Sequence, residues 1–158
     1  EVHLKKVPVN LNVLVDEAVE HFRLQVEEKG GVIRAELDPE GYVMSADEVH
    51  MLNVVCNLID NAIKYSHDSL NIYIYTKQEG NRFIIGVRDT GIGIPKEAQD
   101  KVFKRFYRVP SGNLHNVKGF GLGLSYAKSI VELHGGEIQL TSKKNKGTLV
   151  EIIFKMES

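Results

Sequence analysis

Four polar side chains recur at helical spacing between residues 45 and 65, and side chains of these types can bind metal ions and phosphate. At 100° per residue, one stripe of this segment holds Asn53, Asn57, Asn61 and Lys64. A polar stripe is usually a solvated helix face, but asparagine is a poor helix former and solvent faces normally carry Glu, Lys or Arg. Stacked amide oxygens suit Mg²⁺ that also holds phosphate oxygens, and a lysine adds a point charge for phosphate.

The second candidate is Asp89, which ends an apolar strand pattern and precedes glycines. Phe83, Ile85 and Val87 alternate onto the same face as Asp89, where a carboxylate is costly unless it meets a donor. Asp89 could simply begin a turn in which the glycines supply positive φ angles. Alternatively, its carboxylate accepts a hydrogen bond from the exocyclic amine of a purine, while Gly91 and Gly93 let the backbone approach the ring.

The third candidate is a glycine-rich segment, residues 119–124, which precedes a predicted helix. Free backbone N–H groups at a helix N-terminus form an anion site, although a flexible hinge explains the same glycines. The P-loop pattern G-x-x-x-x-G-K-[ST] is absent from the sequence, as are the H-R-D and D-F-G signatures of protein kinases.

The fourth candidate is residues 103–108, which combine aromatic and basic side chains. Phe103 and Phe106 are expected to be hydrophobic anchors. Arg108, with Arg105 as a second candidate, could reach a γ-phosphate when a lid closes.

Helices and strands must position these candidates, and they alternate in blocks along the chain. The apolar periodicity predicts helices over 11–28, 45–65, 95–103 and 122–134, the second opened by a capping box of Ser45 and Glu48. Strand patterns predict three hairpins, with strands at 32–37 and 42–44, 70–76 and 82–89, and 137–142 and 148–154. Residues 104–118 have no clear period and are interpreted as a functional lid. This order predicts an α+β fold, a two-layer sandwich with helices on one sheet face.

Composition narrows the class of protein. The 158 residues fit one domain, and the net charge of −1 gives no support to a general nucleic-acid binder. Residues 101–131 carry six cations and no acid, so the rest of the chain carries −7. A cationic lid on an acidic body suits a polyphosphate. The single cysteine fits a reducing compartment, and no apolar run reaches the length of a membrane span. Because the sequence lacks an initiator methionine, we expect it to be a fragment of a longer protein.

Together these segments resemble the boxes of the GHKL (Bergerat-fold, HATPase) ATP-binding family, specifically the catalytic domain of bacterial sensor histidine kinases. The N, G1, F and G2 boxes correspond to residues 57–66, 89–94, 103–108 and 119–124, and Gly147-Thr148 matches a late Gly-Thr pair. Phe120 departs from the small or polar residue that is usual at its position in the family. The resemblance covers about residues 7–154. It implies a mixed, mostly antiparallel sheet covered on one face by about three helices, with a flexible ATP lid.

The resemblance implies roles by position. Asn61 would be the principal Mg²⁺ ligand with Asn57 assisting, and Asp89 would bind the adenine amine with support from Thr148. The catalytic residues would be Asn57, Lys64 and Arg108. The nucleotide-binding set would be Asn57, Asn61, Lys64, Tyr65, Asp89, Gly91, Gly93, Ile94, Phe103, Arg105, Arg108, Lys118, Gly119, Gly121, Leu122, Gly123, Leu124 and Thr148.

One substitution favours transfer over hydrolysis. Family members that hydrolyse ATP carry a glutamate four residues before the metal-binding asparagine, where this chain has Asn57, a poor general base. Positioning and charge neutralisation, which supply most of phosphoryl-transfer catalysis, do not require that glutamate. A neutral imidazole is already nucleophilic, so the pattern favours transfer from ATP to a histidine.

The phosphoacceptor helix of the family is absent, so residues 1–158 are expected to be a single catalytic domain that does not autophosphorylate alone. The expected partners are an upstream dimerisation domain and a response-regulator receiver domain, and nucleic acid is not one. We expect a monomeric isolated domain, a homodimeric full protein and a cytoplasmic position in an inner-membrane sensor. The alternatives are a GHKL-type ATPase, an anti-sigma serine kinase module, or a non-catalytic nucleotide-binding docking domain.

Overall fold

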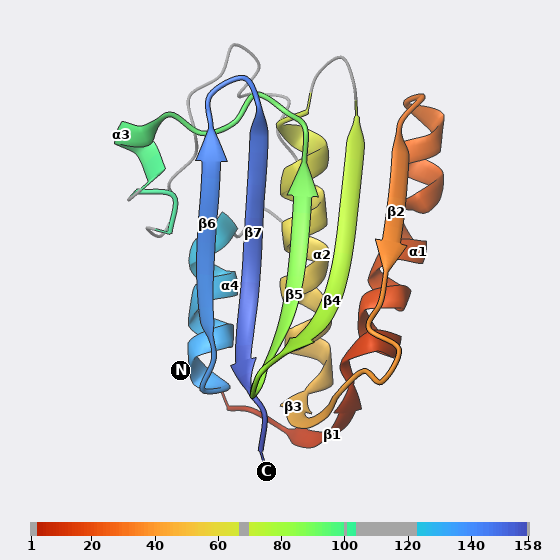
Figure 1. The fold of residues 1–158 in the computed structure, drawn as a ribbon, viewed down its shortest axis with the longest axis vertical. Helices are drawn as coiled ribbons and strands as arrows, with labels where there is room; N and C mark the ends of the chain where they lie inside the picture. Colours follow the sequence, from red (N-terminus) through yellow and green to blue (C-terminus); the bar gives the residue numbers. More distant parts are fainter. Residues whose placement is uncertain (1–2, 67–69, 100, 104–122, 158) are drawn as a thin grey trace.

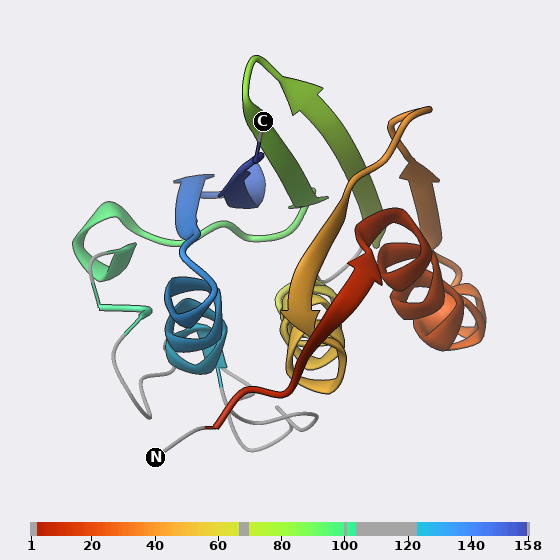
Figure 2. The same ribbon diagram turned by 90° about the horizontal axis from the view of Figure 1, so that it is seen from below.

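A five-stranded sheet with helices on one face positions the candidate residues (Figures 1 and 2). The computed structural model describes residues 3–66, 70–99, 101–103 and 123–157. Its elements are β1 (Lys6–Asn10), α1 (Leu11–Glu28), β2 (Val32–Glu36), β3 (Val43–Asp47), α2 (Glu48–Lys64), β4 (Asn71–Glu79), β5 (Arg82–Asp89), α3 (Lys96–Gln99), α4 (Gly123–Leu133), β6 (Glu137–Lys143) and β7 (Gly147–Lys155).

The sheet has the strand order β2-β4-β5-β7-β6. Strands β4, β5, β7 and β6 pair antiparallel, whereas β2 pairs parallel with β4. Figure 2 shows α1, α2 and α4 on the same side of this sheet, and α3 lies beside β6. The predicted α+β two-layer sandwich, with a mixed, mostly antiparallel sheet and three covering helices, is confirmed.

The core lies between the helices and the sheet because each element buries one apolar stripe. Helix α1 buries residues at helical spacing, from Leu11 through Val15 and Val19 to Val26. The Asn10 carboxamide oxygen caps this helix by accepting from the backbone N–H groups of Asn12 and Val13. The hairpins β4–β5 and β6–β7 are also confirmed, with Asp89 opposite Thr148 in the β5–β7 register.

The hairpin expected over residues 32–44 is wrong. Strand β2 pairs with β4, and β3 pairs antiparallel with β1, which the sequence pattern did not predict. The residues predicted to form the hairpin turn lie in a wider loop that connects β2 to β3. In this loop the Asp38 carboxylate accepts from the backbone N–H groups of Glu40, Gly41 and Gln78. Local turn chemistry therefore could not show that both strands pair with distant segments.

The capping box of Ser45 and Glu48 is also wrong. Ser45 lies within β3, and the Asp47 side chain caps α2 by accepting from the His50 N–H at 3.0 Å. The short helix expected over 95–103 is limited to α3, and the helix expected from 122 begins at Gly123. The lid expected at 104–118 lies outside the described residues.

Candidate functional site

Helix α2 presents an asparagine that is almost completely buried. Asn57 is 1% exposed, and its amide nitrogen donates to the backbone carbonyl of Gly123 at the start of α4. Its carbonyl oxygen, Oδ1, is buried without a hydrogen-bond partner among the described residues. A buried acceptor without a donor is costly, so this oxygen is positioned for a ligand that the polypeptide does not supply.

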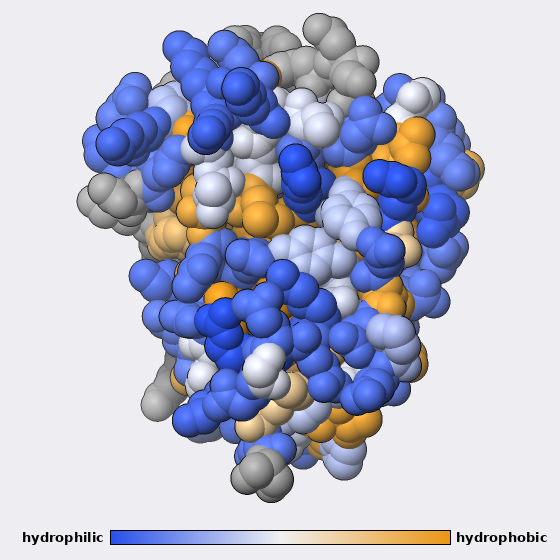
Figure 3. All heavy atoms as spheres, viewed as in Figure 1, coloured by the Kyte–Doolittle hydropathy of each residue, from blue (hydrophilic) through white to orange (hydrophobic). Residues whose placement is uncertain are grey.

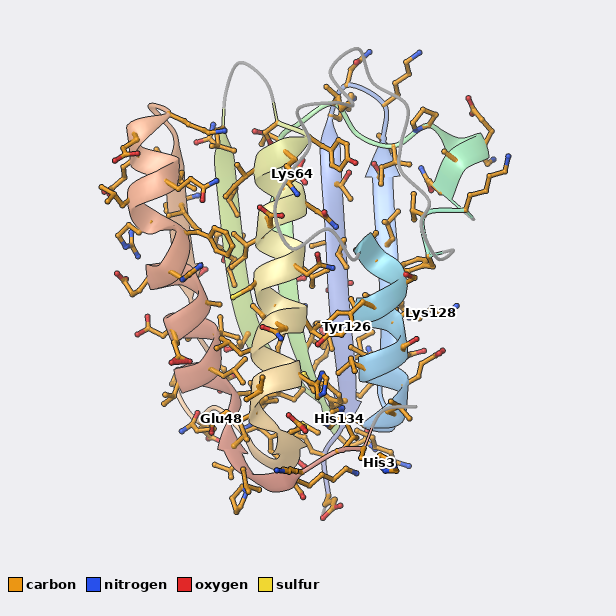
Figure 4. The ribbon with its side chains drawn as sticks, turned by 180° about the vertical axis from the view of Figure 1, so that it is seen from behind. His3, Glu48, Lys64, Tyr126, Lys128 and His134 are labelled. Atoms are coloured by element: carbon orange, nitrogen blue, oxygen red, sulfur yellow. The ribbon has the colours of Figure 1, made fainter. Side chains whose placement is uncertain are left out.

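Two other residues of the predicted stripe, Asn53 and Lys64, contact different parts of the protein. Asn53 donates to the hydroxyl of Tyr126 and therefore belongs to the contact between α2 and α4. Lys64, at the upper end of α2 in Figure 4, forms an ion pair with Asp60 at 2.8 Å. Both side chains of this pair are largely buried, at 11% and 7% exposed. The pair holds the Lys64 ammonium at the end of the helix.

Asp89 is buried at the end of β5, on the helix-facing side of the sheet. Its carboxylate accepts from the backbone N–H groups of Gly91, at 2.8 Å, and Thr148. Burial raises the pKa of this carboxyl to about 6, and the two N–H donors only partly oppose that rise. A desolvated carboxylate with spare acceptor capacity can accept an amine from a ligand.

The loop after Asp89 is held from two sides. The Ile92 N–H donates to the carbonyl of Tyr65 at the end of α2, and the Ile92 carbonyl accepts from the Asn145 N–H in the β6–β7 turn. The Ile94 N–H donates to the Ser142 hydroxyl at 2.7 Å. The end of α2, the loop and the final hairpin thus form one hydrogen-bonded unit.

The glycines of this loop are required by packing within the protein. A Cβ on Gly91 would lie 2.4 Å from the Tyr65 carbonyl oxygen. Gly93 has φ +73° and a Cβ there would lie 2.0 Å from the Lys143 carbonyl oxygen. The close approach expected between a ligand and these glycines is therefore accompanied by a close approach of neighbouring backbone.

A second polar cluster lies at the opposite end of α2 and α4. In Figure 4, His134 lies at the lower end of α4, far from Lys64. Its Nε2 accepts from the Asp47 N–H at 3.0 Å, and its Nδ1 donates to the Ile130 carbonyl at 2.7 Å. The Asp47 carboxylate accepts from the N–H groups of His50 and Lys5, which lower the pKa of that carboxyl. These bonds cap α2 and connect it to α4.

Comparison with known proteins identifies the fold family. Residues 46–158 match the family model "Histidine kinase-, DNA gyrase B-, and HSP90-like ATPase". The chain belongs to this ATPase family. This assignment agrees with the resemblance of its sequence segments to the boxes of sensor histidine kinases.

Individual relatives of this ATPase domain are sensor kinases. The sensor protein RprX of Bacteroides fragilis is 44% identical over 92% of the chain, which spans 28% of that protein. The catalytic domain of histidine kinase ThkA is 26% identical with a TM-score of 0.82, covering 96% of both chains. A structure of ThkA with the response regulator TrrA is 25% identical with a TM-score of 0.79, covering 98% of this chain and 42% of that one. The chain therefore spans about a quarter of the curated relative's length.

The structure brings together several predicted site residues of the ATPase domain. Asn57, Gly123 and Leu124 meet where α2 contacts α4, and Asp89 lies beside Gly91 and Thr148. Phe103 packs against the core, and the Lys128 ammonium lies 5.5 Å from its ring centroid, as expected for an anchor. The predicted residues outside the described part are Arg105, Phe106, Arg108, Lys118, Gly119, Gly121 and Leu122.

The sequence patterns missed Ser142 and Gln99, which support the loop at the candidate site. Thr148, which was expected to support Asp89, contacts it through its backbone N–H, whereas its hydroxyl pairs with Ser142 at 2.8 Å. The Gln99 amide ties the loop to β6 by donating to the carbonyls of Ile94 and Ser142. These side chains act by tertiary contact, so no local spacing could indicate them.

Ser66 is a further residue that the patterns did not assign to the site. Its hydroxyl is buried without a partner among the described residues. The hydroxyl oxygen lies 3.0 Å, and the Asp89 Oδ1 lies 2.9 Å, from the position of a Cβ on Gly91. Its place directly after Tyr65 in the N box was the signal that could have indicated it.

Proposed function

We propose that this domain binds ATP with Mg²⁺ and donates the γ-phosphate to a histidine on an adjacent dimerisation domain. The phosphoryl group would then pass to an aspartate of a response-regulator receiver domain. The family of the chain, its sensor-kinase relatives and the ThkA–TrrA complex support this proposal. In this assignment Asp89 accepts the adenine amine, and Tyr65, Gly91, Gly93, Ile94 and Thr148 form the surrounding wall.

The observation that carries the proposal is the amide at position 57. Asn57 lies where family ATPases have a glutamate that activates water, and a neutral amide is a poor general base. Its nitrogen is bonded to the Gly123 carbonyl, so its oxygen is the atom left for a ligand. The nearby Asp60 carboxylate is engaged by Lys64. The site therefore favours transfer to an external nucleophile over hydrolysis.

The donor set fits Mg²⁺. Among the described residues no group of three or more His, Cys, Asp or Glu could hold a metal ion, so a divalent ion would depend on amide and phosphate oxygens. The unpartnered Oδ1 of Asn57 supplies one such oxygen, and Asn61, one turn later on α2, would supply the other. The ion would neutralise phosphate charge, while Lys64 holds a positive charge at the same helix end.

Residues 103–124 would complete the site in this proposal. Phe103 would anchor a lid, and Arg105, Arg108 and Lys118 would contact the phosphates. The glycine-rich segment with Gly119, Gly121, Leu122 and Gly123 would bind phosphate through backbone N–H groups ahead of α4. Residues 1–158 would thus form one catalytic domain with its lid at 104–118.

Nucleotide titration tests the site assignment. Asp89→Ala and Asn61→Ala should weaken Mg-ATP binding by about tenfold or more, because each removes a direct ligand contact. Asn61→Ala, and to a smaller extent Asn57→Ala, should reduce the difference between affinities measured with Mg²⁺ and with EDTA. Asn81→Ala in the exposed β4–β5 turn is the matched control. If the three site variants bind Mg-ATP like the parent and like this control, the assignment is wrong.

A transfer assay tests the activity itself. The chain is incubated with γ-labelled ATP and a dimerisation domain carrying an acceptor histidine, such as that of RprX. We expect an acid-labile, alkali-stable phosphoprotein and little release of free phosphate. Steady phosphate release without the acceptor would favour an ATPase, and binding without transfer would favour a nucleotide-dependent docking domain.

The organisation of the whole protein is also a proposal. No helix among the described residues is long and apolar enough to span a membrane. We propose an upstream dimerisation domain, a homodimeric full protein and a cytoplasmic position behind an inner-membrane sensor. Light scattering of the isolated chain should give a monomer, and of a chain extended through the dimerisation domain a dimer.

A further inference from the structure

The sheet face opposite the helices carries a cavity that the proposed kinase function does not use. This open face is the one seen in Figure 3. The cavity has a volume of about 370 Å³ and lies over the upper ends of β2 and β4 and the end of β5 (Figure 1). Asp89 points to the other face of the sheet, so the cavity is separate from the nucleotide site.

Two cross-strand rows form the cavity. In the register of β2, β4 and β5, Arg34 lies beside Tyr73, which lies beside Arg88. The neighbouring row, nearer the strand ends, contains Val32, Asn71 and Thr90. Residues two apart on a strand share a face, so both rows point away from the helices. Two guanidinium groups therefore flank an aromatic ring beside polar and aliphatic walls.

The two arginines have no anionic partner within the described residues. Neither Arg34 nor Arg88 forms an ion pair there, and both are exposed. The Glu36 carboxylate, two residues from Arg34 on β2, accepts from the Tyr73 hydroxyl, and Glu151 accepts from the Tyr75 hydroxyl at 2.5 Å. Among the described residues that line the cavity, the charged ones are the two arginines.

The Arg34 guanidinium is also positioned. It lies 5.6 Å from the centroid of the Tyr73 ring, a distance at which the ring face attracts a cation. Stacking restricts the side chain and leaves the N–H edge of the guanidinium available for bonds in its own plane. Arg88 lies on the other side of the same tyrosine. The paired N–H donors of the two guanidinium groups match the oxygens of a carboxylate or phosphate group.

We propose that this cavity is an oxyanion-binding site that takes a carboxylate or phosphate group between Arg34 and Arg88. The aliphatic side chain of Val32 would contact the carbon atoms that carry the anionic group. The oxyanion comes either from a small free anion or from acidic side chains on another polypeptide, and both sources use the same contacts.

Side-chain NMR tests the proposal directly. The ¹⁵N-labelled chain is titrated with inorganic phosphate, with citrate and with an acetylated, amidated tetraglutamate peptide, while the Nε–H signals of Arg34 and Arg88 are followed. We expect a saturable shift of both signals with at least one probe. These signals report the cavity and not the nucleotide site, so the result does not depend on whether the proposed kinase function holds.

Matched variants separate a site from general charge attraction. The double variant R34Q/R88Q should bind the active probe at least about tenfold more weakly, because both charge-assisted contacts are lost. Arg82→Gln removes the same charge from the same strand and face, where Arg82 is paired with Glu79, and should leave the affinity unchanged. Thermal unfolding of each variant checks that the fold is retained.

The outcomes are distinct. Saturable binding of phosphate or citrate alone identifies a free anion, and tighter binding of the peptide identifies a protein partner. The absence of a saturable shift at both arginines with all three probes would overturn the proposal. An equal loss of affinity in R34Q/R88Q and Arg82→Gln would also overturn it, because it would show attraction without a site.

Discussion

Asp47 and Asp89 are both buried, and each accepts two backbone N–H groups, yet their carboxyl pKa values move in opposite directions. At Asp47 the N–H donors of His50 and Lys5 prevail and lower the pKa. At Asp89 desolvation prevails and raises the pKa to about 6. The first carboxylate lies in a cluster whose polar atoms find partners within the protein. The second lies near the hydroxyl of Ser66, which has no hydrogen-bond partner among the described residues.

In the proposed assignment this difference distinguishes a structural end of the domain from a nucleotide-binding end. A fully bonded cluster stabilises the fold, whereas a buried acceptor without a donor has a cost that a ligand can relieve. The contrast predicts that equivalent substitutions at the two ends will have different consequences. Five measurements can contradict or refine it.

The largest expected effect is on ligand binding at the upper end. Asp89→Ala should weaken adenine-nucleotide binding by about 10- to 100-fold, the range for losing a hydrogen bond to a charged group. Its free energy of unfolding at neutral pH should change by less than about 1 kcal/mol, because loss of a desolvated carboxylate offsets two unpaired N–H groups. Calorimetric titration and urea unfolding measure the two quantities. A variant that loses stability but keeps its affinity would reverse our assignment.

The lower end should give the opposite result. Asp47→Ala removes the α2 cap and the acceptor for the Lys5 N–H, so we expect a loss of about 2–3 kcal/mol in unfolding free energy. Nucleotide affinity of the folded variant should be unchanged. Asp16→Ala on the exposed face of α1 is the control for loss of an acidic side chain. Weaker nucleotide binding in folded Asp47→Ala would show that the two ends are coupled.

The pH dependence of binding is the third and smaller effect. In the proposed assignment the adenine amine donates to the ionised carboxylate of Asp89, so binding should lower the pKa of this carboxyl from about 6 and expel a proton. Affinity should therefore rise about fivefold to tenfold between pH 5 and pH 7. Adenosine is the suitable ligand, because it lacks phosphate groups that titrate in this range. The Asp89→Ala variant should show no such rise.

The same carboxyls make opposite contributions to stability as pH changes. Between pH 4 and 6 the folded state holds more proton at Asp89 than the unfolded state, whose pKa is near 3.8, so the contribution of Asp89 falls as pH rises. Asp47 has a lowered pKa, so its contribution is present above pH 4 and is lost on acidification. Urea unfolding against the parent should give difference slopes of opposite sign, for Asp89→Ala between pH 4 and 6 and for Asp47→Ala as pH falls below 4.

The smallest effect concerns the ion pair of Lys64 and Asp60. Asp60→Asn removes the charge that compensates Lys64 and should strengthen ATP binding about twofold to fivefold, at some loss of stability. Adenosine affinity should stay the same, because adenosine has no phosphate groups to interact with the uncompensated charge of Lys64. Equal weakening of ATP and adenosine binding would mean that Asp60 shapes the site instead.

Local patterns predicted the elements that bury one regular stripe. Helix α1 was predicted with its observed ends, and the hairpins β4–β5 and β6–β7 follow from alternation and turn residues. The pairings of β1 with β3 and of β2 with β4 could not be predicted, because their partners lie far along the chain. The spacing rule predicted Ser45 as the cap of α2 instead of Asp47, because it takes no account of the pairing between β1 and β3 that includes Ser45.

The candidate site was predicted where residue type alone carries the chemistry. Asn57 and Asp89 stand out as polar groups on poorly matched or apolar patterns. Both are buried, although the pattern indicated burial only for Asp89. Partners that act through tertiary contact were not predicted, including Asp60 for Lys64 and Ser142 for Thr148. The grouping of Asn53 with the site was also misleading, since only the α4 contact with Tyr126 gives that residue its role.

The strand order has a consequence for how the chain is made. Strand β7 follows β5 and β6 along the chain, yet it lies inside the sheet between them. Its residues Ile152 and Phe154 are almost fully buried, so the core stays open until β7 has left the ribosome. Strand β2 likewise cannot pair in the sheet until β4 has been synthesised. Assembly of this domain therefore requires β7, and a ribosome that stops before β7 leaves an exposed β5 edge prone to pairing with other chains.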